Sequence, residues 1–258
     1  MIVTAALCWW NEQPEDLTAC VDSLAGLADR IVALDGAYAR YPAATVVSPQ
    51  EQVDAIKHAA ARIGVESEVL LPDRLWFGQV EKRTTLLQEG AEGSDWVLML
   101  DADHILHGDM AAVRRILGET RVDVVATIFH TPVGDRPLKD AAGKWHVEQT
   151  TLAPYIPQFY RALPGLQVQR KHWWVTAKKD GQWVWLWGGD AWRPRMPQFR
   201  LSPSDLWVEH RTLMRTEEQI LASRAFLNDR AMVVRSTGQE DDQPELPRPV
   251  WDYITRPA

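Results

Sequence analysis

The chain has little of what several classes of protein require. It has only two cysteines in 258 residues, Cys8 and Cys20, which form no disulfide framework and favour a reducing compartment. No run approaches the roughly 20 apolar residues of a membrane span, and residues 1–10 lack the basic start and apolar stretch of a signal peptide. We therefore expect a cytoplasmic protein without a transmembrane segment.

The chain also lacks positive charge. Its formal net charge is -7, and no basic stripe runs along the sequence. A protein that grips a nucleic-acid backbone is therefore disfavoured, although nucleic acid is not excluded as a substrate. A length of 258 residues suits one large domain or two small ones, with a core that needs no disulfides.

What the chain has in excess is tryptophan, with 13 residues, seven of them between Trp173 and Trp207. Tryptophan is costly as filler, because its N–H needs a partner when it is buried. This cluster distinguishes the second half of the chain from the first.

The first half alternates strand and helix patterns. Apolar runs predict strands at Ile2 to Cys8, Ile31 to Leu34, Val69 to Leu71, the run that ends at Asp101, and Val122 to Phe129. The helices between them have recognisable start signals, which are Pro14, a capping box of Ser48 and Glu51, Gly78, and Asp109. This alternation predicts an α/β fold with a largely parallel central sheet covered on both faces.

The second half breaks this pattern. Six prolines and glycines in residues 132–157 predict a long loop with little regular structure, typical of a lid or a binding loop. Asp180-Gly181 lies between two Trp-Val pairs and predicts a hairpin in an antiparallel, Trp-rich region. We expect a last helix from about Thr216 to Asn228, followed by an extended tail from Gly238.

The most informative segment is the end of the strand at Asp101. The apolar run Trp96 to Leu100 is followed by two carboxylates, Asp101 and Asp103. They repel each other unless one is protonated or a cation lies between them, and Mg²⁺ or Mn²⁺ shared with phosphate oxygens would satisfy both. Because open α/β sheets bind ligands at the carboxyl ends of their strands, the pattern indicates a metal and nucleotide site. The alternative is an Asp-X-Asp that arises by chance in a turn.

These segments carry a resemblance to a known family. The stretch from Ala6 to Glu12, Asp35-Gly36, Gly78 with Lys82-Arg83, and Asp101-Ala102-Asp103 occur in an order that resembles a family 2-like glycosyltransferase of the GT-A fold. A weaker similarity continues through Gln158 to Gly165 and reaches Glu209 to Thr212. The resemblance implies one GT-A domain over residues 1–258, with a nucleotide-sugar-binding half (1–110), an acceptor half (111–215), and a C-terminal helix and tail (216–258).

The resemblance also implies roles for individual residues. A UDP- or GDP-linked sugar donor would contact Trp9, Asn11, Glu12, Asp35, Lys82, Arg83, Asp101 and Ala102. Mn²⁺ or Mg²⁺ would be held by Asp101, Asp103 and His210. Each of these residues could instead have a structural role. Trp9 could pack under the first helix, Asp35 could cap a turn, and Lys82 and Arg83 could lie on a solvated helix face. His210 could be an ordinary hydrogen-bonded histidine. His104 and His107 are expected as solvated loop residues, or at most as neighbours of the metal ligands.

The catalytic base is less clear, because the Glu-Asp pair usual in this family is missing. Asp190, in Gly188-Gly189-Asp190, is the first candidate, with Glu209 and Asp205 as alternatives, and Asp190 could equally be a turn residue. Trp183, Trp185 and Trp187 are expected in the core. Trp173, Trp174 and Trp192 are the candidates for contact with the acceptor.

Together these patterns predict a metal-dependent glycosyltransferase that moves a sugar, with inversion, from a nucleotide sugar to an acceptor hydroxyl of unknown identity. Two alternatives remain open. A nucleotidyltransferase would also combine a nucleotide site with acidic metal ligands, but it usually has a glycine-rich, basic loop after the first strand, where this chain has Trp9 to Glu12. A non-catalytic, Trp-rich carbohydrate-binding protein would not need Asp101 and Asp103.

Overall fold

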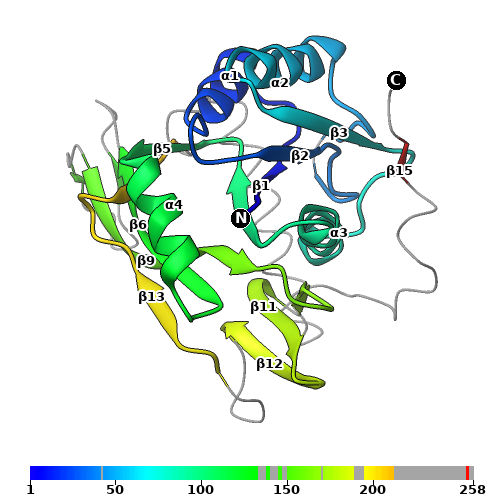
Figure 1. Cartoon of the computed structure of the whole chain (residues 1–258). Coiled ribbons are helices and arrows are strands. Elements are labelled where there is room, and N and C mark those ends of the chain that lie inside the picture. Colours follow the sequence, from blue (N-terminus) through cyan, green and yellow to red (C-terminus); the bar gives the residue numbers. More distant parts are fainter. Residues whose placement is uncertain are drawn as a thin grey trace.

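The computed structural model describes residues 1–41, 43–132, 138–139, 145–146, 150–169, 171–188, 195–211 and 254–255. Within them the chain forms a mixed α/β fold around one large sheet (Figure 1). The strand order is β15-β3-β2-β1-β4-β9-β6-β14-β5, and β13 pairs with β6. The predicted α/β class is confirmed.

Four parallel strands form the centre of the first half. They are β1 (Val3–Cys8), β2 (Arg30–Leu34), β3 (Glu66–Pro72) and β4 (Trp96–Asp101). Both faces of β1 are buried: Ala5 and Leu7 belong to one hydrophobic cluster, and Ala6 and Cys8 to the other. A strand that is buried on both faces has a continuous apolar sequence instead of an alternating one, and this is why β1 could be predicted from the sequence.

Helices cover the two faces of these strands. Residues of α1 (Pro14–Asp22), α2 (Gln50–Arg62) and α4 (Met110–Glu119) share one hydrophobic cluster, and α3 (Gln79–Ala91) lies on the opposite face (Figure 1). The prediction that Asp109 caps a helix is confirmed, because its carboxylate accepts a hydrogen bond from the Ala112 N–H at 3.0 Å. The predicted capping box at Ser48 is wrong, since the helix is capped at Pro49 without a side-chain bond.

The second half extends the sheet with strands of mixed direction. These are β5 (His104–Gly108), β6 (Val124–Pro132), β9 (Thr150–Arg161), β13 (Gln198–Arg200) and β14 (Leu206–His210), while β15 (Ile254–Thr255) pairs with β3 at the far edge. The predicted loop over residues 132–157 is wrong where β9 begins at Thr150. That strand lies between β4 and β6, and its two prolines, Pro154 and Pro157, fall at the two register shifts of its ladder with β6.

A separate three-stranded sheet carries much of the tryptophan. It contains β10 (Gln167–Gln169), β11 (Lys171–Lys179) and β12 (Gln182–Trp187), all antiparallel, and β7 (Leu138–Lys139) pairs with β8 (Trp145–His146) elsewhere. The predicted hairpin is confirmed, and both turn residues have positive φ, 52° at Asp180 and 77° at Gly181. Trp185 is buried, as expected for a core position. The predicted helix from Thr216 to Asn228 and the tail lie outside the described residues.

No helix in the described part of the chain is long and apolar enough to cross a membrane.

Candidate functional site

The carboxyl ends of three parallel strands meet at one edge of the sheet. Cys8 at the end of β1 pairs with Leu34 of β2 on one side and with Asp101 of β4 on the other. The segments that follow these strands therefore start side by side, as the sequence predicts for Trp9 to Glu12, Asp35 and Asp101 to Asp103. This edge is where a ligand is expected in an open α/β sheet.

Asp35 uses its carboxylate to hold the loop that leads into α2. It is fully buried and accepts hydrogen bonds from the Ser48 N–H at 2.6 Å and the Ser48 hydroxyl at 2.7 Å. The Ser48 Oγ accepts in turn from the N–H of Asn11, at 2.9 Å. Burial raises the pKa of Asp35, and the bonds from Ser48 only partly offset this. Asp35 thus ties the loop after β1 to the loop after β2.

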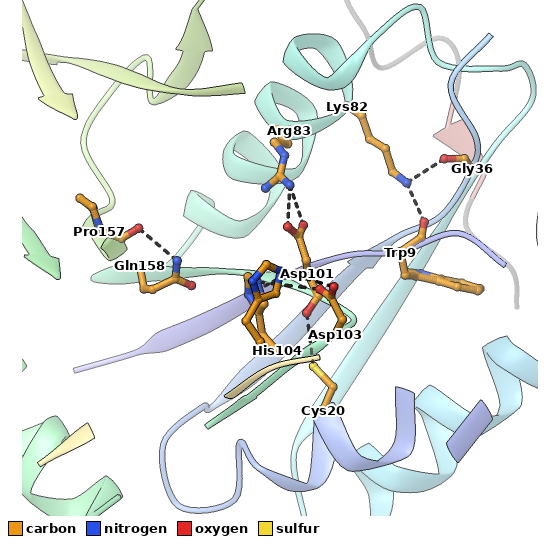
Figure 2. Close-up of polar contacts among 11 residues, drawn as sticks. Trp9, Cys20, Gly36, Lys82, Arg83, Asp101, Asp103, His104, Pro157 and Gln158 are labelled. Carbon is orange, nitrogen blue, oxygen red and sulfur yellow. Dashed lines mark hydrogen bonds and ion pairs between the residues drawn. The ribbon is translucent and has the colours of Figure 1, made fainter. Parts of the chain in front are cut away.

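Lys82 joins the ends of β1 and β2. Its ammonium group donates to the carbonyl of Trp9 at 2.6 Å and to the carbonyl of Gly36 at 2.7 Å (Figure 2). The side chain is only 1% exposed, so the ammonium is not on a solvated helix face. In this structure its hydrogen bonds go to backbone carbonyls at the sheet edge.

Arg83, the next residue of α3, pairs with Asp101. One guanidinium nitrogen lies 2.7 Å from each carboxylate oxygen of Asp101. Burial raises the pKa of Asp101, but the charge of Arg83, its hydrogen bond and the nearby His104 together outweigh burial and leave that pKa below its usual value. Asp101 is therefore an anion neutralised by an arginine at the end of β4.

Asp103, His104 and His210 form a candidate metal centre. One potential ligand atom from each lies within 4.8 Å of the others. An oxygen of Asp103 is 3.5 Å from Nε2 of His210, and the other is 3.9 Å from Nε2 of His104. Ligands at about 2.1 Å from a shared ion lie roughly 3–4 Å apart, and carboxylate with imidazole suits Mn²⁺-like ions. The donor set therefore fits a divalent cation.

Pairing between two distant strands builds this centre. His104 on β5 lies opposite His210 on β14 in antiparallel register, and the rings are 5.0 Å apart. The N–H of Arg211 donates to the carbonyl of Asp103 at 2.8 Å and extends the contact beyond β14. The site consequently needs the second half of the chain as much as the first.

The ring of His104 lies beside Asp103, with Nε2 3.9 Å from a carboxylate oxygen, which is longer than a hydrogen bond. Its Nδ1 lies 3.2 Å from the N–H of Asp101 and accepts from it, which puts the proton of the neutral ring on Nε2, facing Asp103. Burial lowers the pKa of His104 and favours that neutral ring. The candidate cluster therefore contains Asp103, His104 and His210, whereas the predicted ligands are Asp101, Asp103 and His210. In the structure Asp101 pairs with Arg83, and the predicted ligand roles stay predictions.

His104 also differs from the expected solvated loop residue, because it lies on β5 and is buried. His107 is more exposed, and its Nε2 lies 2.8 Å from Oε2 of Glu209. Glu209 also accepts from Arg211 at 2.8 Å. Since side chains alternate along a strand, Glu209 and the adjacent His210 point to opposite faces of β14. Glu209 is therefore turned away from the metal centre.

The remaining predicted site residues are placed as follows. Trp9 belongs to the hydrophobic core, Ala102 and Glu12 are buried, and the N–H of Glu12 donates to Gln52. Trp174 packs edge-to-face with Trp185 at 5.5 Å, and Trp173 lies in β11, although its side chain is not described. Asp190 and Trp192 lie outside the described residues. These roles stay predictions.

One residue near the site was not singled out in the sequence. Gln158, on β9, is 3% exposed, and its Oε1 has no hydrogen-bond partner among the described residues. A signal was present, because Gln158 is a lone amide in the otherwise apolar run Tyr155 to Tyr160.

No protein-family model and no curated protein matches this chain. Solved structures that match part of this chain include a 4-diphosphocytidyl-2C-methyl-D-erythritol synthase from Anaerococcus prevotii, with 12% identity, a TM-score of 0.33, and coverage of 62% of this chain and 70% of that one. HddC from Yersinia pseudotuberculosis matches with 8% identity, a TM-score of 0.34, and coverage of 63% and 74%.

This finding overturns the predicted function. Neither structure is described as a glycosyltransferase, so the predicted glycosyl transfer is corrected, and a GT-A glycosyltransferase fold is not confirmed. With identities of 8–12% and TM-scores of 0.33 and 0.34, the two matches do not say what this chain does, so its function has to be argued from the site itself.

Proposed function

We propose that the protein is a metal-dependent nucleotidyltransferase. An oxygen of a phosphorylated second substrate attacks the α-phosphorus of a nucleoside triphosphate, the bond to the β-phosphate oxygen breaks, and pyrophosphate leaves. The observation that carries the proposal is the cluster of Asp103 and His210 at the sheet edge, beside the loops that follow β1 and β2. Metal ligands at that edge suit a substrate that brings phosphate oxygens.

Asp103 and His210 would hold the ion, with the ring of His104 beside them. A bound Mn²⁺ or Mg²⁺ would neutralise charge that develops on the leaving pyrophosphate. The loop after β1, Trp9 to Glu12, contains no glycine, lysine or arginine. Since Lys82 donates to two backbone carbonyls, the described residues near this loop offer little positive charge for a triphosphate. The proposal therefore requires strict dependence on a divalent ion.

Two features of the chain would position the nucleotide. The Asp35–Ser48–Asn11 hydrogen bonds fix the two loops that border the nucleotide side of the edge. Arg83 neutralises the charge of Asp101, so that this carboxylate would not repel the phosphates of a bound nucleotide. We also propose the cytoplasm as the setting, because both cysteines are free and buried.

Thermal unfolding of the wild type and of Asp103→Asn, with ATP, CTP, GTP or UTP and with or without MnCl₂, tests the proposal. A nucleotide at about 100 times its dissociation constant adds about 2.7 kcal/mol, or roughly 5–10 °C in a chain of this size. We expect a shift for the wild type with at least one triphosphate, only when Mn²⁺ is present, and none for Asp103→Asn. Pyrophosphate release on addition of sugar or polyol phosphates then reports turnover.

Asp180→Asn is the matched control, because Asp180 lies in the β11–β12 turn at a φ of 52°, which asparagine tolerates. It should behave as the wild type. The proposal is overturned if no triphosphate gives a Mn²⁺-dependent shift, or if Asp103→Asn responds as strongly as the wild type.

A further inference from the structure

The first turns of α3 contain four consecutive polar residues, Glu81 to Thr84, and each bonds to a different part of the fold. All four are buried. The carboxylate of Glu81 accepts from a backbone N–H of the loop before the helix, at 2.7 Å. Lys82 donates to the carbonyls at the ends of β1 and β2, and Arg83 binds Asp101 at the end of β4 (Figure 2). Where these side chains reach depends on how α3 is rotated about its axis.

Thr84 bonds to the outer strand of the three-stranded sheet, whose order is β10-β11-β12. Its hydroxyl donates to the carbonyl of Val168 on β10 at 3.2 Å and accepts from the N–H of the same residue at 3.1 Å. Both residues are buried, so water has little access to these two backbone groups if the hydroxyl is removed. One side chain of α3 thus takes the place of a neighbouring strand at the edge of β10.

The second half of α3 is held in a different way. A side-chain carbon at Gly90 would come within 3.3 Å of the Ala6 side chain and 3.2 Å of the Val97 side chain, so the helix packs closely on β1 and β4 there. Gly90 is about two helical turns from Arg83, too far to fix its direction. Because Thr84 directly follows Arg83, its bonds to β10 hold the helix backbone at the point from which the guanidinium reaches the end of β4.

The ion pair gives this anchor a consequence for binding. One terminal nitrogen of Arg83 lies 2.7 Å from both oxygens of Asp101, so a small displacement of the helix backbone lengthens both contacts. The attraction between two charges weakens as their separation grows. Asp101 would then carry uncompensated negative charge at the sheet edge where the phosphates of a nucleotide are expected.

We propose that Thr84 is a positioning residue, which holds Arg83 against Asp101 by bonding the backbone of β10. The inference rests on the proposed function and extends it to the second half of the chain. The three-stranded sheet contributes to nucleotide binding through α3.

Thr84→Val tests the role, because valine has the shape of threonine and lacks the hydroxyl. Isothermal titration with MnCl₂ measures the affinity for whichever of ATP, CTP, GTP and UTP stabilises the wild type. At low salt we expect Thr84→Val to bind it about threefold to tenfold more weakly, the effect of one partly uncompensated charge near the phosphates. The difference should shrink between about 0.05 M and about 0.5 M NaCl, because salt screens that charge. Thr84→Ser keeps the hydroxyl and should bind as the wild type does.

Thr85→Val is the matched control. Thr85 is the next residue of α3 and is also buried, but its hydroxyl donates to the carbonyl of Glu81 within the same helix at 3.1 Å. Both valine variants lose a buried hydroxyl from α3, and only Thr84→Val loses the bonds to β10. Thr85→Val should keep the wild-type affinity at both salt concentrations, and an equal loss of affinity in the two variants would overturn the proposal. If Thr84→Val does not fold, Thr84→Cys takes its place with the same expectation, because a thiol hydrogen-bonds only weakly.

A double-mutant cycle shows whether Thr84 acts through the ion pair. Asp101→Asn removes the charge that Arg83 neutralises and keeps the shape of the side chain. In the Asp101→Asn background, Thr84→Val should therefore weaken binding by less than about twofold. A loss as large as in the wild-type background would mean that Thr84 acts elsewhere. No nucleotide response in Asp101→Asn itself would mean that Asp101 serves the metal, and either result overturns the inference.

The two proposals fail in different results. A wild type that shows no Mn²⁺-dependent response to any triphosphate overturns the proposed function. If the wild type responds and Thr84→Val binds the triphosphate as tightly as Thr85→Val does, the proposed function stands and Thr84 has a purely structural role.

Discussion

Replacement of Lys82 by methionine would remove the group that joins the ends of β1 and β2. The substitution keeps an unbranched side chain and deletes the ammonium that donates to the carbonyls of Trp9 and Gly36 at 2.6 and 2.7 Å. The same ammonium lies 5.7 Å from the centre of the Tyr38 ring. Since the side chain is 1% exposed, water cannot simply replace it.

The expected loss of stability follows from these contacts. Two hydrogen bonds from a charged donor contribute about 1.5–3 kcal/mol each, and the carbonyls they leave behind are buried. The wild type already loses part of this stabilisation, because burying the ammonium in the folded state removes it from water. The substitution should therefore lower the free energy of unfolding by a net amount of about 2–4 kcal/mol. At roughly 2–4 °C per kcal/mol for a chain of this size, the unfolding temperature should fall by about 5–15 °C.

Urea unfolding followed by tryptophan fluorescence measures the free energy directly, and a thermal scan gives the temperature. Lys57→Met, in the more exposed surface of α2, is the matched control and should change stability by less than about 0.5 kcal/mol. If Lys82→Met is as stable as the wild type but binds nucleotides more weakly, the reasoning is refuted. The ammonium would then serve a phosphate, as the resemblance implied, rather than the two carbonyls.

Two further predictions concern residues around the site. Burial raises the pKa of Glu209, but the hydrogen bonds and charges of Arg211 and His107 outweigh burial and lower it. The ionised carboxylate therefore stabilises the fold fully above the ordinary glutamate pKa of about 4.3. This stabilisation is lost as the pH falls through the lower pKa that Glu209 has in the folded protein. Glu209→Gln should therefore be less stable than the wild type at pH 7, with the difference in urea unfolding shrinking below about pH 4, while its Mn²⁺-dependent nucleotide response persists. A lost response at unchanged stability would instead place Glu209 in the catalytic machinery. Cys20 is fully buried under the site, and its burial and the nearby Asp103 raise the pKa of its thiol. Cys8 is also free and buried. Iodoacetamide should therefore label neither cysteine at pH 8 until the chain is unfolded in urea. Rapid labelling of the native chain would contradict the packing described here.

The parallel half of the fold was accessible to prediction because its signals are local. The strands that end at Cys8, Leu34 and Asp101 are continuous apolar runs, and the helices between them begin at proline, glycine or aspartate. The same logic failed at Ser48, where a capping-box pattern is present but the hydroxyl binds Asp35 instead. A buried carboxylate 13 residues away in the sequence competed successfully for that serine.

The candidate metal centre was predictable only in part. Asp103 follows from its place after β4, and His210 came from the resemblance. However, the pairing of His104 with His210 depends on β5, a strand in a segment where the sequence predicts a loop. The contact of Arg83 with both oxygens of Asp101 was equally unpredictable. Nothing in the order Lys82-Arg83 tells which of the two side chains faces the end of β4 and which reaches the carbonyls.

Hydrophobic periodicity and turn chemistry, which act between near neighbours, were enough to determine the α/β class and to bring Asp35 and Asp101 to one edge of a parallel sheet. The partners of the buried polar groups were decided by the tertiary structure alone. Asp101 pairs with an arginine, Lys82 with two carbonyls and His104 with His210, while the Gln158 oxygen at a bulge of β9 has no partner among the residues that the structure describes. Such contacts depend on which distant segments burial forces together, and no short stretch of sequence contains that information.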